Sequence, residues 1–166
     1  MPNLNSVIAD IINPGLALLP AKMDSRAARV LLLAMGLQES NFEHVRQIGG
    51  GPGRGNWQFE PGTKLSRGGV WGIYLHSASR GHLESICRIR GVQFEPHAIW
   101  LQIERDAPFA CACARLLMWT DAGALPAADD ELGGWSFYAG VWRPGRPRFE
   151  TWAANHRDAR QACGVA

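Results

Sequence analysis

The sequence has 166 residues, of which 46% are apolar and 19% charged, and its net charge is +2. This length and balance are typical of one globular domain, 1–166, and exclude a disordered chain. No apolar run reaches the roughly 20 residues of a membrane helix, and the interspersed charges do not favour nucleic acid. We therefore expect neither an integral membrane segment nor a nucleic-acid partner.

The N-terminal segment 1–23 is expected to hold a helix over Leu4–Ile12, which ends at Asn13-Pro14, and a connector. It has no basic start and is interrupted early by proline, so it does not resemble a secretory signal. We therefore expect synthesis in a cytoplasm without a signal peptide.

The next helix begins after Asp24 or Ser25, either of which can cap it, and continues to about Gln38. Its interior is apolar on nearly every face, so it belongs inside a domain. From Gly49 to Gly69 the sequence becomes rich in glycine and loses its periodicity. We expect a short strand at Asn56–Glu60 there, in a small β-hairpin or ordered loop inserted after the helix.

Helical patterns then resume to the end of the chain. The expected helices are Val70–Leu75, His82–Arg90, Pro96–Arg105, Ala107–Thr120, a helix capped by Asp129 or Asp130 that continues to Trp142, and Arg148–Ala162. The fold class is therefore mainly α, or α+β, with one irregular insert. We place a core at 24–152 and a C-terminal helix within 148–166.

Neither the cysteines nor the histidines show the spacing of a metal site. The four cysteines contain no CxxC pair, and the five histidines form no HExxH motif. Buried, reduced thiols are expected, with no metal and no cofactor.

Glu39 lies at the end of the most apolar helix, directly before the insert. A helix C-terminus and apolar neighbours both disfavour a charged carboxylate, so the pKa of Glu39 should be raised, as a general acid requires. The alternative is a solvated residue at the helix end beside Arg29 or Arg46.

The insert places Gln58 between two large aromatic residues, Trp57 and Phe59. In a glycine-rich segment these side chains are suited to one wall of a sugar-binding cleft, with ring stacking and directed amide hydrogen bonds. The alternative is that the two aromatic residues cover the core.

The pair Glu39-Ser40, followed by Gly55-Asn56-Trp57-Gln58, resembles the Glu-Ser…Gly-Leu-Met-Gln signature of lytic transglycosylases in the lysozyme-like superfamily. The resemblance covers about Ala27 to Trp152 and is closest to the small single-domain versions of phages and prophages. Those proteins share runs similar to Trp57-Gln58-Phe59-Glu60, Leu117-Met118-Trp119-Thr120-Asp121 and Trp142-Arg143-Pro144-Gly145.

The resemblance implies a lysozyme-like fold and cleavage of peptidoglycan glycan strands between N-acetylmuramic acid and N-acetylglucosamine. Glu39 would be the single catalytic acid and base, and the muramic acid 6-hydroxyl would close a 1,6-anhydro ring. Ser40 and Gln58 match positions that orient the acid or hold the sugar. A phage origin implies synthesis in a bacterial host, and action on the cell wall in the periplasm or packaging with tail or virion proteins.

Two features depart from the family pattern. Phe137-Tyr138-Ala139-Gly140 stands where the family has Tyr-Asn-x-Gly, so Phe137 replaces the tyrosine whose hydroxyl would approach Glu39. Tyr138 offers a hydroxyl from the next position, which helix geometry turns about 100° away. This departure favours, as an alternative, an inactive tail or virion protein that keeps the fold.

The second departure is Glu60, a carboxylate on the expected cleft strand. If it faces Glu39 across about 6.5–9.5 Å, it can activate water, and the protein is then a hydrolysing, inverting muramidase. The alternative is a residue paired with Arg54 or Arg67. The basic run Arg143-Pro144-Gly145-Arg146-Pro147-Arg148 is interpreted as a solvated connector that can touch an anionic glycan.

Overall fold

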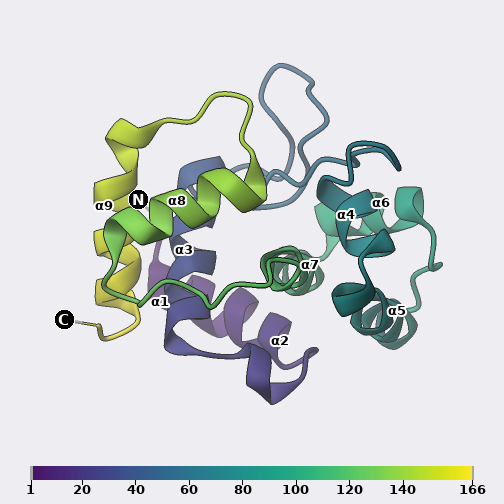
Figure 1. Ribbon diagram of the computed structural model, residues 1–166, viewed down its shortest axis with the longest axis horizontal. Helices are drawn as coiled ribbons and strands as arrows, with labels where there is room; N and C mark the ends of the chain where they lie inside the picture. Colours follow the sequence, from purple (N-terminus) through teal and green to yellow (C-terminus); the bar gives the residue numbers. More distant parts are fainter. Residues whose placement is uncertain (1, 166) are drawn as a thin grey trace.

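The computed structural model describes residues 2–165, which are mainly helical (Figure 1). Most helices lie where the sequence predicts them, because capping residues and apolar periodicity are local signals. In chain order the elements are α1 (Leu4–Val7), the π-helical turn η1 (Ile8–Ile12), α2 (Asn13–Leu16), the 3₁₀ turn η2 (Ala21–Met23), α3 (Arg26–Ser40), α4 (Gly69–Leu75), α5 (Ser77–Arg90), α6 (Pro96–Arg105), α7 (Ala107–Trp119), α8 (Glu131–Trp142) and α9 (Phe149–Ala162).

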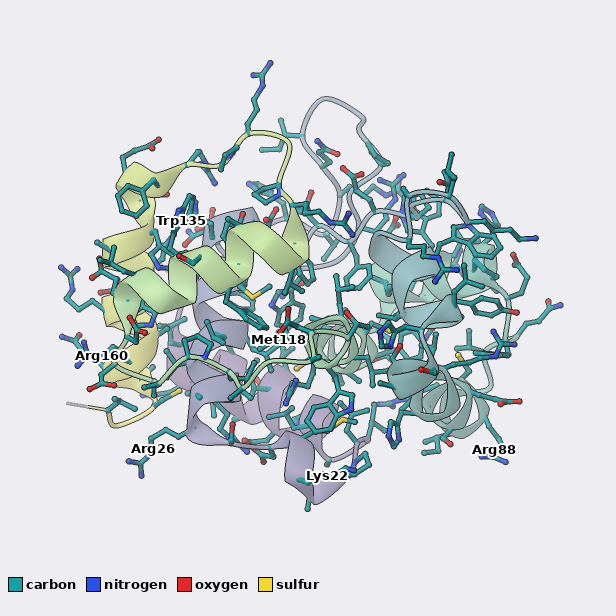
Figure 2. All side chains as sticks on the ribbon, in the orientation of Figure 1. Lys22, Arg26, Arg88, Met118, Trp135 and Arg160 are labelled. Carbon is teal, nitrogen blue, oxygen red and sulfur yellow. The ribbon has the colours of Figure 1, made fainter. Side chains whose placement is uncertain are left out.

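The helix α7 forms the centre of the core. Every residue from Phe109 to Met118 is buried, and α7 contacts α2, α3, α4, α5, α6 and α8. Its alanines and cysteines are small, so the neighbouring helices can approach it closely. Figure 1 shows α7 almost end-on near the middle of the molecule, and Figure 2 shows Met118 there and Trp135 near α9.

The helix α3 carries the candidate acid and is buried along most of its length. Ser25 begins it, because its hydroxyl oxygen accepts a hydrogen bond of 3.1 Å from the Ala28 amide. Asn41 ends it in the left-handed conformation, at φ 54°. Since α3 contacts α7, α8 and α9 and is buried almost to Ser40, its C-terminal end lies inside the protein.

The N-terminal helical run is longer than predicted. It does not end at Asn13-Pro14 but continues to Leu16. The Asn13 amide bonds to the Ile8 carbonyl, five residues back, so the turn before Pro14 is wider than an α-helical turn. A wider turn gives the proline ring the room that a regular helix lacks.

The prediction of a strand at Asn56–Glu60 is wrong. In the described residues the insert contains only isolated bridges, from Arg54 to Arg46 and to Phe59. Gln58 has a left-handed backbone, at φ 47°, which interrupts any strand. The insert is therefore an ordered loop and not a hairpin.

The other differences are small. The helix α5 begins at Ser77 and not at His82, because the His76 side chain accepts a hydrogen bond from the Ala78 amide and caps it. Within residues 2–165, no helix combines the length and the apolar character that crossing a membrane requires. The two end residues of the predicted domain, 1 and 166, lie outside the described part.

Candidate active site

A cleft of about 750 Å³ lies where the end of α3, the insert, α8 and the turn between α8 and α9 meet. The side chains that line it are partly acidic, partly basic and partly aromatic. They include Gln38, Glu39, Gln47, Gln58, Phe59, Glu60, Ser66, Leu117, Tyr138, Val141, Trp142, Arg143, Arg146 and Arg148.

Glu39 lies in this cleft, and its carboxyl group is largely removed from water. Its pKa is raised from 4.5 to about 7, chiefly by burial, and the nearby charge of Glu60 acts in the same direction. The hydrogen bond from Tyr138 and the charge of Arg148 lower the pKa, but burial has the larger effect. The elevated pKa expected from the sequence is therefore present, and the carboxyl holds and releases a proton near neutral pH.

Tyr138 faces Glu39, contrary to the expectation from helix geometry. Its hydroxyl donates a hydrogen bond of 2.6 Å to Glu39 Oε1. The helix α8 packs on α3 with the Tyr138 side inward, and the ring stacks on Trp152 at 5.2 Å with an interplanar angle of 11°. Phe137 is only partly buried, at the edge of the core. The hydroxyl group that Phe137 lacks is thus supplied to Glu39 by the next residue, Tyr138.

Gln38, the neighbour of Glu39, fastens the turn before α9 to α3. Its amide nitrogen donates to the Arg148 carbonyl at 2.8 Å, and its amide oxygen accepts from Thr151 at 3.0 Å and from Asn155 at 2.7 Å. Arg148 in turn donates to the Gln38 carbonyl. Sequence reasoning missed this network, and its only signal was a buried-type position occupied by glutamine in an apolar helix.

Ser40 and Trp57 do not line the cleft, so the structure does not bring them together with the other residues proposed to hold a sugar. Ser40 is buried, donates to the Asn56 carbonyl at 2.6 Å and accepts from the Phe42 amide at 3.1 Å. Trp57 has 0% of its surface exposed, and its indole donates to the Leu32 carbonyl at 2.9 Å. Both side chains instead attach the insert to α3.

Gln58 and Phe59 do line the cleft. The Gln58 amide nitrogen donates to the Gly55 carbonyl at 2.9 Å, which fixes the side chain across its own turn. Phe59 is only 1% exposed, so its ring belongs to the core behind the cleft wall. The half-buried Trp142 meets it edge-on at 5.0 Å and supplies the aromatic surface of the cleft. The cleft therefore combines a fixed amide with aromatic surface, as a sugar-binding site requires.

Glu60 lines the same cleft and is exposed. Its carboxylate makes no hydrogen bond or ion pair within residues 2–165, whereas its backbone carbonyl accepts from the Val70 amide at 3.0 Å. The proposed pairing with Arg54 is wrong, because Arg54 pairs with Glu104 at 2.9 Å. Glu60 is near enough to Glu39 for its charge to raise the pKa of that carboxyl.

Over the described part of the chain, no three His, Cys, Asp or Glu side chains come together as a metal site. Cys87, Cys111 and Cys113 are free and buried, and burial raises the pKa of each thiol. These thiols are not suited to nucleophilic chemistry, which requires the thiolate.

No protein-family model matches the chain, and no curated protein and no solved structure is detectably similar to it. The chemistry of the cleft therefore rests on its own geometry. A carboxyl with a pKa of about 7, a tyrosine that stabilises its charged form and an aromatic side chain in the same cleft can support general acid–base catalysis.

Proposed function

We propose that this protein is a lytic transglycosylase with a lysozyme-like fold that cleaves peptidoglycan between N-acetylmuramic acid and N-acetylglucosamine. The observation that carries this proposal is the Glu39 carboxyl, which has a pKa of about 7 and accepts the Tyr138 hydrogen bond inside the cleft. The substrate class is inferred from the Glu39-Ser40 and Gly55…Gln58 motifs, which resemble those of lytic transglycosylases.

In the first step, protonated Glu39 gives its proton to the glycosidic oxygen while the bond from that oxygen to C1 of muramic acid breaks. The N-acetyl group of the same sugar stabilises the positive charge that develops at C1. In the second step, the Glu39 carboxylate removes the proton from the muramic acid 6-hydroxyl, and O6 bonds to C1. The products carry a 1,6-anhydro ring, and Glu39 is protonated again.

The surroundings of Glu39 suit both steps. Burial keeps a large share of the carboxyl protonated near neutral pH, so the acid form is available for the first step. After the proton has left, the Tyr138 hydroxyl and the charge of Arg148 stabilise the carboxylate. A pKa near the working pH makes both forms accessible within one cycle.

Hydrolysis by a muramidase is the second candidate, and the position of Glu60 favours it. Glu60 lines the cleft and acts electrostatically on Glu39. As a base, it would take a proton from water while that water attacks C1 in place of O6. An inactive tail or virion protein is the third candidate. It is suggested by Phe137, which stands where the family has a tyrosine, and it is less favoured because the Tyr138 hydroxyl bonds to Glu39 instead.

We further propose a phage or prophage setting, on the basis of the motif runs around Gln58 and Trp142. The protein would be made in the bacterial host and act on the cell wall in the periplasm, or be packaged beside tail or virion proteins. Peptidoglycan strands are the proposed partner in either case.

The test is mass spectrometry of the soluble products from purified peptidoglycan, with wild type, Glu39→Gln and Glu43→Gln. Glu43 is an exposed carboxylate outside the cleft and serves as the matched control. We expect 1,6-anhydro-muramic acid ends from wild type and Glu43→Gln, and none from Glu39→Gln. Reducing muramic acid ends would establish hydrolysis instead. No products from a folded wild type would contradict catalysis on this substrate.

A further inference from the structure

The turn between α8 and α9 places three arginines along the cleft that contains Glu39. Arg143, Arg146 and Arg148 all line it. Figure 1 shows this turn leaving the end of α8 and passing over to the start of α9. Pro144 and Pro147 stand between the arginines and restrict the backbone. Positively charged guanidinium groups along one cleft favour an anionic ligand there.

Two of the three arginines are available to a ligand. Arg143 and Arg146 are exposed, and their guanidinium groups make no hydrogen bond or ion pair within residues 2–165. By contrast, Arg46, just before the insert, and Arg54, within it, both pair with Glu104. Arg148 differs from its neighbours, because it is bound to Gln38 and its charge acts on Glu39.

The charge balance of the cleft also favours an acidic ligand. The lining contains Arg143, Arg146 and Arg148 against two carboxyl groups. Glu39, with a pKa of about 7, carries only a partial negative charge near neutrality. The cleft therefore has a net positive charge, and a neutral amino-sugar chain has no anionic group to interact with it.

In peptidoglycan the carboxylates are on the stem peptides, which leave the glycan chain at the lactyl group of muramic acid. A substituent that points out of the cleft can meet the exposed side chains of its lining, which include Arg143 and Arg146. Guanidinium groups match carboxylates in geometry and bind them with charge-assisted hydrogen bonds.

We propose that Arg143 and Arg146 bind stem-peptide carboxylates of the strand in the cleft, so that the protein selects acidic, peptide-bearing peptidoglycan over neutral amino-sugar polymers. This inference rests on the proposed function, because it takes peptidoglycan as the strand. The arginines act on recognition of the substituent, while Glu39 acts on the glycosidic bond.

The test measures binding without turnover, in the Glu39→Gln background, by co-sedimentation with insoluble peptidoglycan. One sample keeps its carboxylates, and the other has them converted to amides with carbodiimide and ammonia. The variant is Arg143→Gln/Arg146→Gln. The control is Arg88→Gln/Arg105→Gln, which removes the same charge from exposed positions on α5 and α6; Figure 2 shows Arg88 on α5, far from the turn.

We expect the cleft variant to bind native peptidoglycan about tenfold more weakly, the effect of losing charge-assisted hydrogen bonds, and the control to bind normally. Amidation should weaken binding of the unchanged cleft to the level of the variant and leave the variant unaffected. Added salt should weaken the unchanged cleft more than the variant.

Equal binding by the two double variants, or binding that is insensitive to amidation, would overturn the inference. Product analysis of the same arginine variants with Glu39 intact separates this result from failure of the proposed function. If wild type cleaves peptidoglycan but binding does not depend on the arginines, the inference about stem peptides is contradicted and the proposed function stands. Binding that depends on the arginines, without cleavage by wild type, supports the inference and contradicts the proposed function.

Discussion

The Tyr138 hydroxyl donates a hydrogen bond of 2.6 Å to Glu39 Oε1, although the two residues are 99 positions apart in the sequence. The bond joins α8 to the last turn of α3 inside the cleft. It opposes the effect of burial, because it stabilises the carboxylate and lowers the pKa of Glu39. The working pKa of the proposed acid therefore depends on contact between two distant helices.

Replacing Tyr138 with phenylalanine should raise the pKa of Glu39, because the charged form loses its donor. The alkaline limb of the pH–activity profile should move to higher pH, and cleavage at neutral pH should fall about tenfold, as one hydrogen bond to a charged group predicts. Tyr74→Phe is the matched control, since Tyr74 is the only other tyrosine and lies outside the cleft. An unchanged profile in Tyr138→Phe would show that the bond does not tune Glu39.

Glu39→Gln should be more stable than wild type at alkaline pH. Burial raises the pKa of Glu39 from 4.5 to about 7, so its neutral form stabilises the folded state. In wild type this contribution is fully present below about pH 4.5 and is lost as pH rises through 7. The advantage of the variant should grow from near zero at about pH 4 to the order of 3 kcal/mol above about pH 8. Urea unfolding across this range measures it, and a difference that does not change with pH would contradict the buried titration.

The exposed Glu43→Gln variant provides the comparison for that experiment. Its difference from wild type at each pH is the baseline against which the rise of Glu39→Gln is measured. The same two variants also separate catalysis from folding. Glu39→Gln should lose about 10²–10⁴-fold in cleavage rate while it remains folded, as loss of a general acid predicts.

Glu60→Gln distinguishes transglycosylation from hydrolysis. In the favoured mechanism Glu60 takes no proton, so activity should stay within about twofold and the products should keep their anhydro ends. The pKa of Glu39 should fall because the charge of Glu60 no longer raises it, and the alkaline limb should move to lower pH. Loss of activity together with reducing-end products from wild type would assign the base role to Glu60.

Gly69→Ala should disturb the cleft wall. Gly69 has φ +54°, and a Cβ there would lie 2.0 Å from the Glu60 carbonyl oxygen. The collision is with backbone, so we expect a loss of about 1–3 kcal/mol in the free energy of unfolding. Gly140→Ala, in α8 with open space around its Cβ, should be neutral or stabilising. Equal stability of the two variants would contradict the close contact between Gly69 and Glu60.

The strand expected at Asn56–Glu60 shows how a local pattern misleads. Trp57 and Phe59 are both buried, and the residue between them is not, which is the alternation of a strand. The alternation arises differently here, because Gln58 is left-handed and the Trp57 indole is held by the Leu32 carbonyl on α3. Such a contact between distant residues leaves no mark in the spacing of the segment itself.

The sequence by itself determined the helices and the candidate acid. Ser25 and Asp130 cap α3 and α8 through atoms within three residues, and the apolar surroundings of Glu39 are contained in its own helix. Interactions of this range depend only on the local order of residues, so they can be predicted from the sequence.

Only the tertiary structure decided which side chains surround that acid. Tyr138 and Arg148 reach the end of α3 because α8 and α9 pack against it, and Trp57 turns to the core because the insert folds back on α3. These arrangements result from packing between elements far apart in the chain. Because the direction of packing depends on the whole core, no single segment of the sequence encodes it.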